Sequence, residues 1–160
     1  MEKLKVAIYC RVGRKESSNE DLKIEMQKYT VNQYLKDKVK EIQSKEYYID
    51  NGFSGTNYDR PEFRRMIQDV EEKRINTIIV QDLVRFGRTN NTLDRIEALK
   101  RKYGVNFISI IEEIDTINNM NEFNQIRLIQ KCIKDSFNES IRLNRKFRSN
   151  KVRLEGSKID

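Results

Sequence analysis

The sequence predicts an α/β domain of three layers, with a mostly parallel central sheet flanked by helices and a long helix towards the C-terminus. Runs rich in β-branched and aromatic residues alternate with longer segments of helical periodicity, as in folds built from strand–helix–strand units. One proline and six glycines in 160 residues argue against a linker-rich or repeat architecture. Functional residues in such sheets gather at the carboxyl ends of the strands, so a site is expected there.

The first strand is expected in "KVAIYCRV", residues 5–12, because this run is rich in β-branched residues. Ser17 and Glu20 then have the spacing of a capping box, which predicts the start of a helix. Apolar residues follow at helical spacing: Leu22, Met26 and Tyr29, with Ile24, Val31 and Leu35 beside them. The spacing predicts a helix with an apolar side.

A short second strand, "EYYI", is predicted to end at Asp50 and to be followed by the glycine-containing loop "NGFSGTNY". Asp59 is a candidate cap for the next helix, with Pro61 in its first turn and Glu62 three residues after the cap. The helix pattern is strong, because apolar residues stand at i, i+3, i+4 and i+7: Phe63, Met66, Ile67 and Val70.

The run "TIIV", residues 77–80, is continuously apolar and predicts a strand buried on both faces. "QDLVRFGR" leads out of this strand, and the helix after it is marked by Leu93, Ile96 and Leu99 and ends near Gly104. "VNFISII" predicts another strand. Residues 118–150 predict one long helix with an apolar stripe of Phe123, Ile126, Ile133, Phe137 and Ile141. We therefore expect a core at 1–117, a long helix at 118–153 and a tail at 154–160.

The composition limits the possible functions of the chain. Its net charge is +7, with a pI of about 9.4, which favours an anionic partner and nucleic acid first, although a domain can be basic without one. Two cysteines and no histidine argue against a structural zinc site and remove the commonest general base. The sequence shows no signal peptide and no apolar run long enough to span a membrane, so we expect a cytoplasmic protein with no membrane partner.

The strand ends contain a group of arginines. Side chains alternate along a strand, so Tyr9 and Arg11 share one face and Cys10 takes the other, where it is expected in the core. Arg85 and Arg88 follow the third strand at a spacing of i, i+3, and on a helical turn they point the same way. Together with Arg11 they favour a bound phosphate, because each guanidinium donates two hydrogen bonds at once and keeps its charge.

Other interpretations of these residues stay open. Ion pairs of the arginines with Asp50, Asp82 and Asp115 would need no ligand at all. The three aspartates would also suit a divalent-metal phosphoesterase, although nearby arginines weaken cation binding. The sequence has neither a Walker loop nor a G-x-G-x-x-G motif, so it supports no nucleotide cofactor. We expect no metal and no other cofactor.

A basic run lies between residues 140 and 154, where every ionisable group is a cation: Arg142, Arg145, Lys146, Arg148, Lys151 and Arg153. Such runs are often only the solvated side of a helix. An uninterrupted cationic stretch also suits a DNA backbone, since it neutralises phosphates and releases their counterions. We predict contact with DNA here.

Three segments together resemble the catalytic domain of serine site-specific recombinases, and most closely the large ones. They are "VAIYCRV", "YYIDNGFSGTNYDRPEFRRMIQDVEEKRINTIIVQDLVRFGR" and "NFISIIEEIDT", in this order. The resemblance covers residues 5–153 and implies the resolvase-like fold. It also implies a reaction on DNA: a serine attacks the phosphodiester and becomes linked to the 5′ end, the subunits rotate, and the ends are rejoined without metal or ATP.

The resemblance also implies roles for individual residues. Arg11, Arg85 and Arg88 fall on the catalytic arginine positions, and Tyr9 matches an active-site tyrosine. Asp50, Ser54 and Arg60 match the loop that helps to shape the site, and we add Gln27 to this supporting set. The long helix resembles a dimerisation helix whose basic end lies over DNA, which implies a homodimer or tetramer on DNA.

The chain departs from the family pattern at one decisive position. Family members read R-V-S where this chain reads Arg11-Val12-Gly13, so the nucleophilic serine is absent. The next hydroxyl groups, on Ser17 and Ser18, lie where a helix is expected to begin and are not expected to replace it. A separate DNA-binding domain is not seen either, so we expect a catalytic domain cut from a longer recombinase or a degenerate stand-alone copy. In the first case Gly13 is a natural or introduced loss of the nucleophile; in the second the chain binds DNA or regulates an active recombinase.

Overall fold

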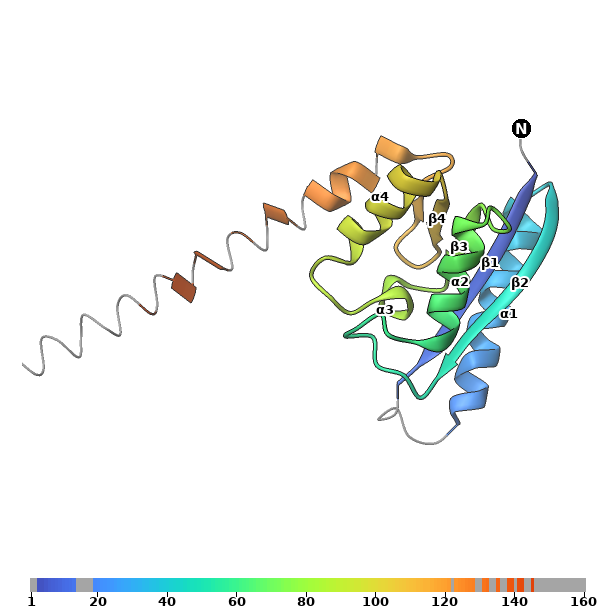
Figure 1. The fold of residues 1–160 in the computed structure, drawn as a ribbon, viewed down its shortest axis with the longest axis horizontal. Coiled ribbons are helices and arrows are strands. Elements are labelled where there is room, and N and C mark those ends of the chain that lie inside the picture. Colours follow the sequence, from blue (N-terminus) through green and yellow to red (C-terminus); the bar gives the residue numbers. More distant parts are fainter. Residues whose placement is uncertain are drawn as a thin grey trace, which may run out of the picture. The chain divides into compact units, whose positions relative to one another are not determined.

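The computed structural model describes residues 3–13, 19–121 and 123–128, together with 131–132, 135, 138–139, 141–142 and 145. These residues contain a sheet of five strands in the order β2-β1-β3-β4-β5 (Figure 1). The strands are β1 (Leu4–Val12), β2 (Ile42–Asn51), β3 (Thr77–Val80), β4 (Asn106–Ser109) and β5 (Ile114–Asp115). The first four pair in parallel and only β5 is antiparallel, to β4, so the predicted α/β class with a mostly parallel sheet is confirmed.

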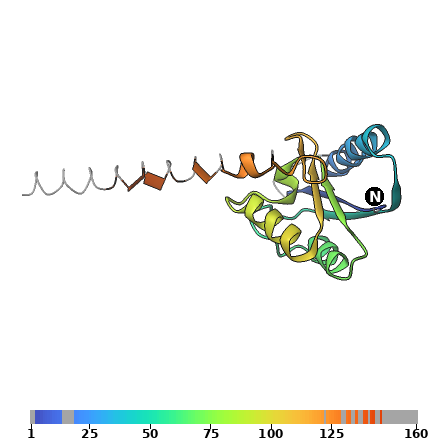
Figure 2. The ribbon, with the colours of Figure 1, turned by 90° about the horizontal axis from the view of Figure 1, so that it is seen from above.

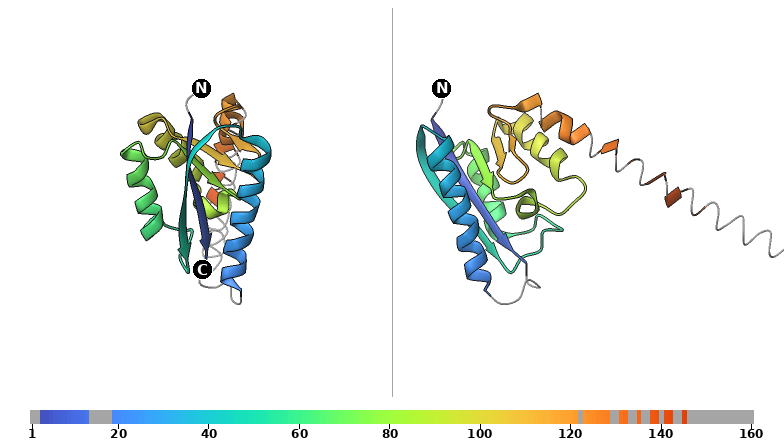
Figure 3. Two further views of the ribbon diagram at one scale, coloured as in Figure 1. Left: turned by 90° about the vertical axis from the view of Figure 1, so that its right-hand side faces the viewer. Right: turned by 180° about the vertical axis from the view of Figure 1, so that it is seen from behind.

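Helices cover both faces of the sheet, as the views in Figures 2 and 3 show. They are α1 (Glu20–Lys38), α2 (Pro61–Glu71), α3 (Leu83–Phe86) and α4 (Thr92–Tyr103). Helix α1 lies on one face, and α2 and α4 lie on the other. The strand "TIIV" is buried at all four residues, as predicted, and α4 ends at Gly104 in the left-handed conformation that glycine adopts without strain.

The buried side of α1 differs from the first apolar set in its sequence. Leu22, Met26 and Tyr29 are exposed, whereas the helix buries Ile24, Gln27, Val31 and Leu35. These apolar residues pack against Val6, Ile8, Cys10 and Val12 of β1. Ser17 of the predicted capping box lies outside the described residues, and Asn19 occupies the N-cap position with a φ of 74°. The buried side therefore includes a polar residue that periodicity alone could not select.

The predicted cap of α2 is wrong. Asp59 makes no cap and instead pairs with Arg64 at 3.1 Å, while Arg60 occupies the N-cap position without a side-chain hydrogen bond to the helix. The cap comes from β2: Asp50 accepts from the backbone N–H of Glu62 at 3.1 Å and of Phe63 at 2.9 Å. A carboxylate at this place satisfies two unpaired N–H groups and opposes the positive end of the helix dipole.

Two further elements differ from their predicted bounds. Strand β2 starts at Ile42 rather than within "EYYI". The strand predicted in "VNFISII" is shorter, because the chain turns after Ser109 and pairs back on β4 through β5. Glu113 has a φ of 55° in this turn. Glycine usually occupies positions with such a φ, but the sequence contains no glycine here that would indicate the turn.

The chain divides into two compact units, residues 1–123 and 124–160. In the second unit every described position from 124 to 145 is helical, as the prediction of a long helix requires there. The predicted division at residue 117 and the roles of the later segments stay predictions. Within the described residues, no helix is long and apolar enough to cross a membrane.

Candidate active site

Alternation along β1 separates two environments, as predicted. Cys10 is buried among the apolar residues that pack on α1, and burial raises the pKa of its thiol to about 12. Tyr9 lies on the α2 side, where its ring meets Phe63 edge-on with centroids 5.5 Å apart. A thiol with so high a pKa stays protonated, so Cys10 acts as a core residue and not as a nucleophile.

Tyr9, Asp50 and Arg60 form a buried chain of hydrogen bonds. The Tyr9 hydroxyl donates to Asp50 Oδ2 at 2.8 Å and accepts from Arg60 Nη1 at 2.6 Å. Arg60 Nη2 also donates to the Phe86 carbonyl at 2.7 Å, and its guanidinium lies 4.5 Å from the Phe63 ring centroid. Burial raises the pKa of Tyr9 far above its ordinary value, and the Asp50 charge adds to this effect. Tyr9 is therefore a neutral hydroxyl with its oxygen fully engaged.

Arg11 is completely buried, and backbone carbonyl groups surround its guanidinium. Its Nε donates to the Arg85 carbonyl at 3.2 Å, its Nη1 to Phe53 at 2.7 Å and its Nη2 to Val84 at 2.9 Å. Burial lowers the pKa of Arg11, and the positive charges of Arg88 and Arg60 lower it further. These carbonyls belong to the loop after β2 and to α3, which follows β3. The Arg11 side chain therefore connects the ends of β1, β2 and β3.

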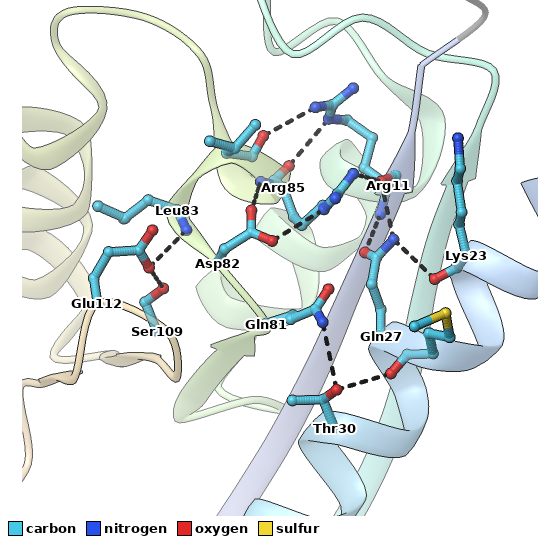
Figure 4. A network of polar contacts seen from close by, with 12 residues as sticks. Arg11, Lys23, Gln27, Thr30, Gln81, Asp82, Leu83, Arg85, Ser109 and Glu112 are labelled. Atoms are coloured by element: carbon cyan, nitrogen blue, oxygen red, sulfur yellow. Dashed lines mark hydrogen bonds and ion pairs between the residues drawn. The ribbon is translucent and has the colours of Figure 1, made fainter. Parts of the chain in front are cut away.

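Gln27 holds the backbone of Arg11 in place. Its Oε1 accepts from the Arg11 N–H at 3.1 Å, and its Nε2 donates to the Arg11 carbonyl at 3.3 Å. The register with β3 covers only Val6 to Ile8, so β1 has no β3 partner at Arg11. The Gln27 side chain on α1 instead forms the hydrogen bonds that a neighbouring strand would form with the Arg11 backbone. Figure 4 shows these bonds together with the arginines.

Arg85 and Arg11 hold each other through their backbones. Arg85 Nη1 donates to the Arg11 carbonyl at 3.1 Å, while the Arg11 side chain donates to the Arg85 carbonyl (Figure 4). Arg88 lies beyond α3, where Gly87 is extended, so the expected common helical turn with Arg85 is wrong. Arg88 nevertheless comes close to Arg11, because both pack on Gly55. A Cβ atom at Gly55 would lie 2.8 Å from Arg11 Nη2 and 2.9 Å from Arg88 Cγ.

Gly13 follows β1 and is buried. It is the last described residue before positions 14–18, so Ser17 and Ser18 lie outside the described part of the chain. Ser54 is exposed in the loop after β2, where its hydroxyl lies 2.8 Å from that of Thr56. The Arg85 carbonyl accepts from Arg11 Nε at 3.2 Å and from Arg60 Nη1 at 3.3 Å. It thereby joins Tyr9, Asp50 and Arg60 to Arg11 and Gln27 in one network.

The three aspartates at strand ends serve different partners. Asp50 caps α2, Asp82 pairs with Arg85 at 3.3 Å, and Asp115 accepts from the N–H of Ile117 at 2.8 Å. Among the described residues no three His, Cys, Asp or Glu side chains are grouped as metal ligands. Of the ion pairs considered from the sequence, the one between Arg85 and Asp82 is present.

Glu112 supports α3 from outside the arginine cluster, a contact that the sequence did not reveal. Its Oε2 accepts from the Leu83 N–H at 3.0 Å, at the start of α3, and also from the Ser109 hydroxyl (Figure 4). The carboxylate reaches α3 from the turn between β4 and β5, 29 residues further along the chain. Only the tertiary fold shows which helix it supports.

A cavity of about 740 Å³ lies elsewhere in the first unit. It is lined on one side by Lys5, Glu46 and Tyr48 of the sheet and on the other by Arg65, Asp69, Lys73 and Arg74. Both of its arginines are paired with carboxylates, Arg65 with Glu62 at 2.7 Å and Arg74 with Asp69 at 2.5 Å. The cavity shares no residue with the arginine site.

The basic run falls in the second unit. Arg142 and Arg145 are helical positions there, whereas Lys146, Arg148, Lys151 and Arg153 lie outside the described residues. Contact of this run with DNA stays a prediction.

The fold is therefore that of a three-layer α/β domain with a cluster of arginines at the carboxyl ends of its parallel strands. The chain matches the resolvase N-terminal domain family over residues 6–154, and it belongs to that family. The resemblance to serine recombinase catalytic domains stated from the sequence is thereby confirmed.

Curated and solved relatives agree with this assignment. The serine recombinases gin of Escherichia phage Mu and Escherichia phage D108 are each 32% identical over 78 residues, which are 49% of this chain and 39% of theirs. The match thus spans about two fifths of the length of these relatives. The N-terminal catalytic domain of TP901-1 integrase has a TM-score of 0.69 and 31% identity, covering 84% of this chain and 96% of that domain. A resolvase family site-specific recombinase from Streptococcus pneumoniae has a TM-score of 0.65 and 25% identity, covering 90% and 94%.

Proposed function

We propose that this chain is the DNA-processing domain of a serine recombinase in which Gly13 stands at the position of the nucleophile, so that the chain binds DNA without cutting it. The observation that carries the proposal is the convergence of Arg11, Arg85 and Arg88 at the carboxyl ends of the strands, where Gly13 follows β1 directly in the chain. The names of its relatives support the reaction class, since they are a recombinase and an integrase.

In this proposal Arg85 and Arg88 bind the scissile phosphate, while the buried Arg11 adds its positive charge to the site and holds Arg85 in place. Their positive charge stabilises the extra negative charge that develops on the phosphoryl oxygens when a nucleophile attacks. Arg11 is the most firmly fixed of the three, because three carbonyls and Gln27 hold its side chain and backbone. Fixed donors need little reorganisation in the transition state, which is where such a site gains its rate.

Gly13 removes the attacking oxygen from this arrangement. Tyr9 does not replace it, because its hydroxyl is buried, protonated and bound to Asp50 and Arg60. Cys10 faces the apolar core on the opposite side of β1. Neither the Tyr9 hydroxyl nor the Cys10 thiol is therefore available to attack a phosphate.

The test is the formation of a covalent protein–DNA adduct. The chain, its Gly13→Ser variant and its Gly13→Ala variant are incubated with a pool of short duplexes of random sequence, and adducts are separated on a denaturing gel. We expect an adduct at the 5′ end only with Gly13→Ser, and similar DNA binding by all three. Gly13→Ala is the matched control, because it adds the same Cβ without a hydroxyl.

Two results would count against the proposal. An adduct with the unchanged chain would show that another residue is the nucleophile. The second is a loss of DNA binding when only Gly13 is changed and Arg11, Arg85 and Arg88 are intact. This would show that the backbone at Gly13 matters rather than the missing hydroxyl.

A second candidate function is a non-catalytic relative that binds DNA or regulates an active recombinase. Gly13 is the observation that favours it. It predicts that Gly13→Ser forms no adduct although DNA still binds, because a degenerate site has lost more than its nucleophile. Assembly as a homodimer or tetramer on DNA, and DNA contact by the basic run from Arg142 to Arg153, belong to both candidates as proposals.

A further inference from the structure

The helix that carries Arg85 is only four residues long and depends on two carboxylates from outside it. Asp82 Oδ1 accepts from the Arg85 N–H at 3.2 Å, and Glu112 Oε2 accepts from the Leu83 N–H at 3.0 Å. An isolated helix of this length has no stability of its own, since four residues cannot offset the cost of nucleation. Both carboxylates therefore fix the position of α3, as Figure 4 shows.

Only one of the two carboxylates also holds a guanidinium. Asp82 Oδ2 lies 3.3 Å from Arg85 Nε, in an ion pair whose side chains are 14% and 20% exposed. The same guanidinium donates through Nη1 to the Arg11 carbonyl at 3.1 Å. Glu112 binds the Leu83 amide and the Ser109 hydroxyl, and none of its described hydrogen bonds involves an arginine.

We propose that Asp82 is a positioning residue: it orients the Arg85 guanidinium towards the phosphate site through Nε, while Glu112 supports α3 alone. This proposal rests on the proposed function, since it assigns Arg85 to the phosphate. The arrangement has a cost as well as a benefit. A carboxylate next to a phosphate-binding arginine weakens the attraction for an anion, but it fixes the geometry on which phosphoryl transfer depends.

If Asp82 positions Arg85, removing the Asp82 charge affects DNA affinity and the rate of adduct formation differently. Removing the charge of Asp82 leaves DNA binding equal or up to about threefold tighter, because a repulsion between carboxylate and phosphate is lost. The same change slows adduct formation at least about tenfold, because the guanidinium is no longer held within the narrow range that the reaction needs. A purely structural role would leave both unchanged or weaken both.

The experiment compares Asp82→Asn with Glu112→Gln. Both variants keep an oxygen that can accept the backbone N–H of α3, and asparagine is as good an N-cap as aspartate. Each is made in the unchanged chain and in the Gly13→Ser variant. The measurements are the ¹⁵N–¹H resonance of Arg85 Nε, assigned by its loss in Arg85→Lys, the affinity for a random-sequence duplex, and the rate of adduct formation. Thermal unfolding confirms that each variant is folded.

The proposal predicts that Asp82→Asn shifts the Arg85 Nε resonance, keeps or raises DNA affinity and slows adduct formation, while Glu112→Gln changes none of the three. It is overturned if the Arg85 resonance is the same in Asp82→Asn, or if Glu112→Gln has equal effects. If Gly13→Ser forms no adduct, the proposed function is contradicted, because the site then lacks more than its nucleophile. The resonance and the DNA affinity then still decide the role of Asp82.

Discussion

Side chains on the two faces of β1 are equally buried and opposite in kind. Towards α1 stand Val6, Ile8, Cys10 and Val12, which pack with the apolar residues of that helix. Towards α2 stand Tyr9 and Arg11, fully buried and bonded to charged or polar partners. Apolar packing tolerates many sequences of similar volume, whereas a buried polar network is stable only if every member has its partner. The α2 face of β1 therefore contains a buried polar network where the α1 face has a simple apolar core.

The largest effect is expected from breaking the polar face at Asp50. Asp50→Ala removes a negative charge that interacts electrostatically with Arg60. It also leaves the Tyr9 hydroxyl without its acceptor and two N–H groups of α2 without a cap. Removing one partner of a buried charged network costs about 3–5 kcal/mol in the free energy of unfolding. Urea denaturation followed by circular dichroism measures this loss.

Asp59→Ala is the matched control for this prediction. Asp59 is the aspartate nearest in sequence to the start of α2, but it is exposed and its ion pair in the described structure is with Arg64, itself 68% exposed in its side chain. Its removal is expected to change the free energy of unfolding by less than about 0.5 kcal/mol. A loss at position 59 as large as at position 50 would contradict the assignment of the cap.

The next effect tests the apolar face through two leucines of α1. Leu35 is 3% exposed and packs in the cluster with β1, so Leu35→Ala is expected to destabilise by about 2–5 kcal/mol through lost burial and a residual cavity. Leu22 is 57% exposed, and Leu22→Ala is expected to stay within about 0.5 kcal/mol. The same denaturation assay measures both. Equal costs would mean that α1 buries a different side from the one described.

This pair of leucines also shows how far the sequence alone could be read. Strands β1 to β4 and helix α2 were predictable, because each depends on residues close together in the chain. The alternation of strands and helices predicted a mostly parallel sheet, whereas the antiparallel β5 was not predicted. The α1 sequence contains two apolar sets at helical spacing, and the choice between them depends on Gln27. A polar residue is buried there because β1 lacks a strand partner at Arg11, which only the assembled sheet reveals.

The side chains that gather at the strand ends were predictable in part, but their connections were not. Alternation placed Tyr9 and Arg11 on one face, and the exit of the third strand indicated Arg85 and Arg88. The family resemblance supplied Asp50 and Arg60. The cap of α2 by Asp50 and the support of α3 by Glu112 join elements that are distant in sequence. Such contacts follow from tertiary packing, so capping rules applied to neighbours chose Asp59 instead.

The smallest effect is expected at the second tyrosine–aspartate pair of the sheet, Tyr48 and Asp69. Tyr48 stands opposite Tyr9 on β2 and donates to Asp69 Oδ2 at 2.5 Å, while Arg74 binds the other oxygen of Asp69. Burial alone would raise the pKa of Asp69, but the hydrogen bonds from Tyr48 and Arg74 outweigh it and hold that pKa below its ordinary value. Arg74 is 59% exposed in its side chain, so solvent reaches this pair as it does not reach Asp50.

A carboxyl group with a lowered pKa stabilises the folded state above its unfolded pKa of about 4, and this contribution is lost as the pH falls through the folded value. Asp69→Asn is therefore expected to destabilise by about 1 kcal/mol at pH 7, with a smaller difference from the unchanged chain at pH 3. Urea denaturation at the two pH values measures this. Glu46→Gln, which changes an exposed partner of Arg65, serves as control and should show no such convergence. If the cost of Asp69→Asn is the same at both pH values, the Asp69 charge adds nothing. The second pair would then be held by the neutral hydrogen bond of Tyr48, unlike the charged network around Asp50.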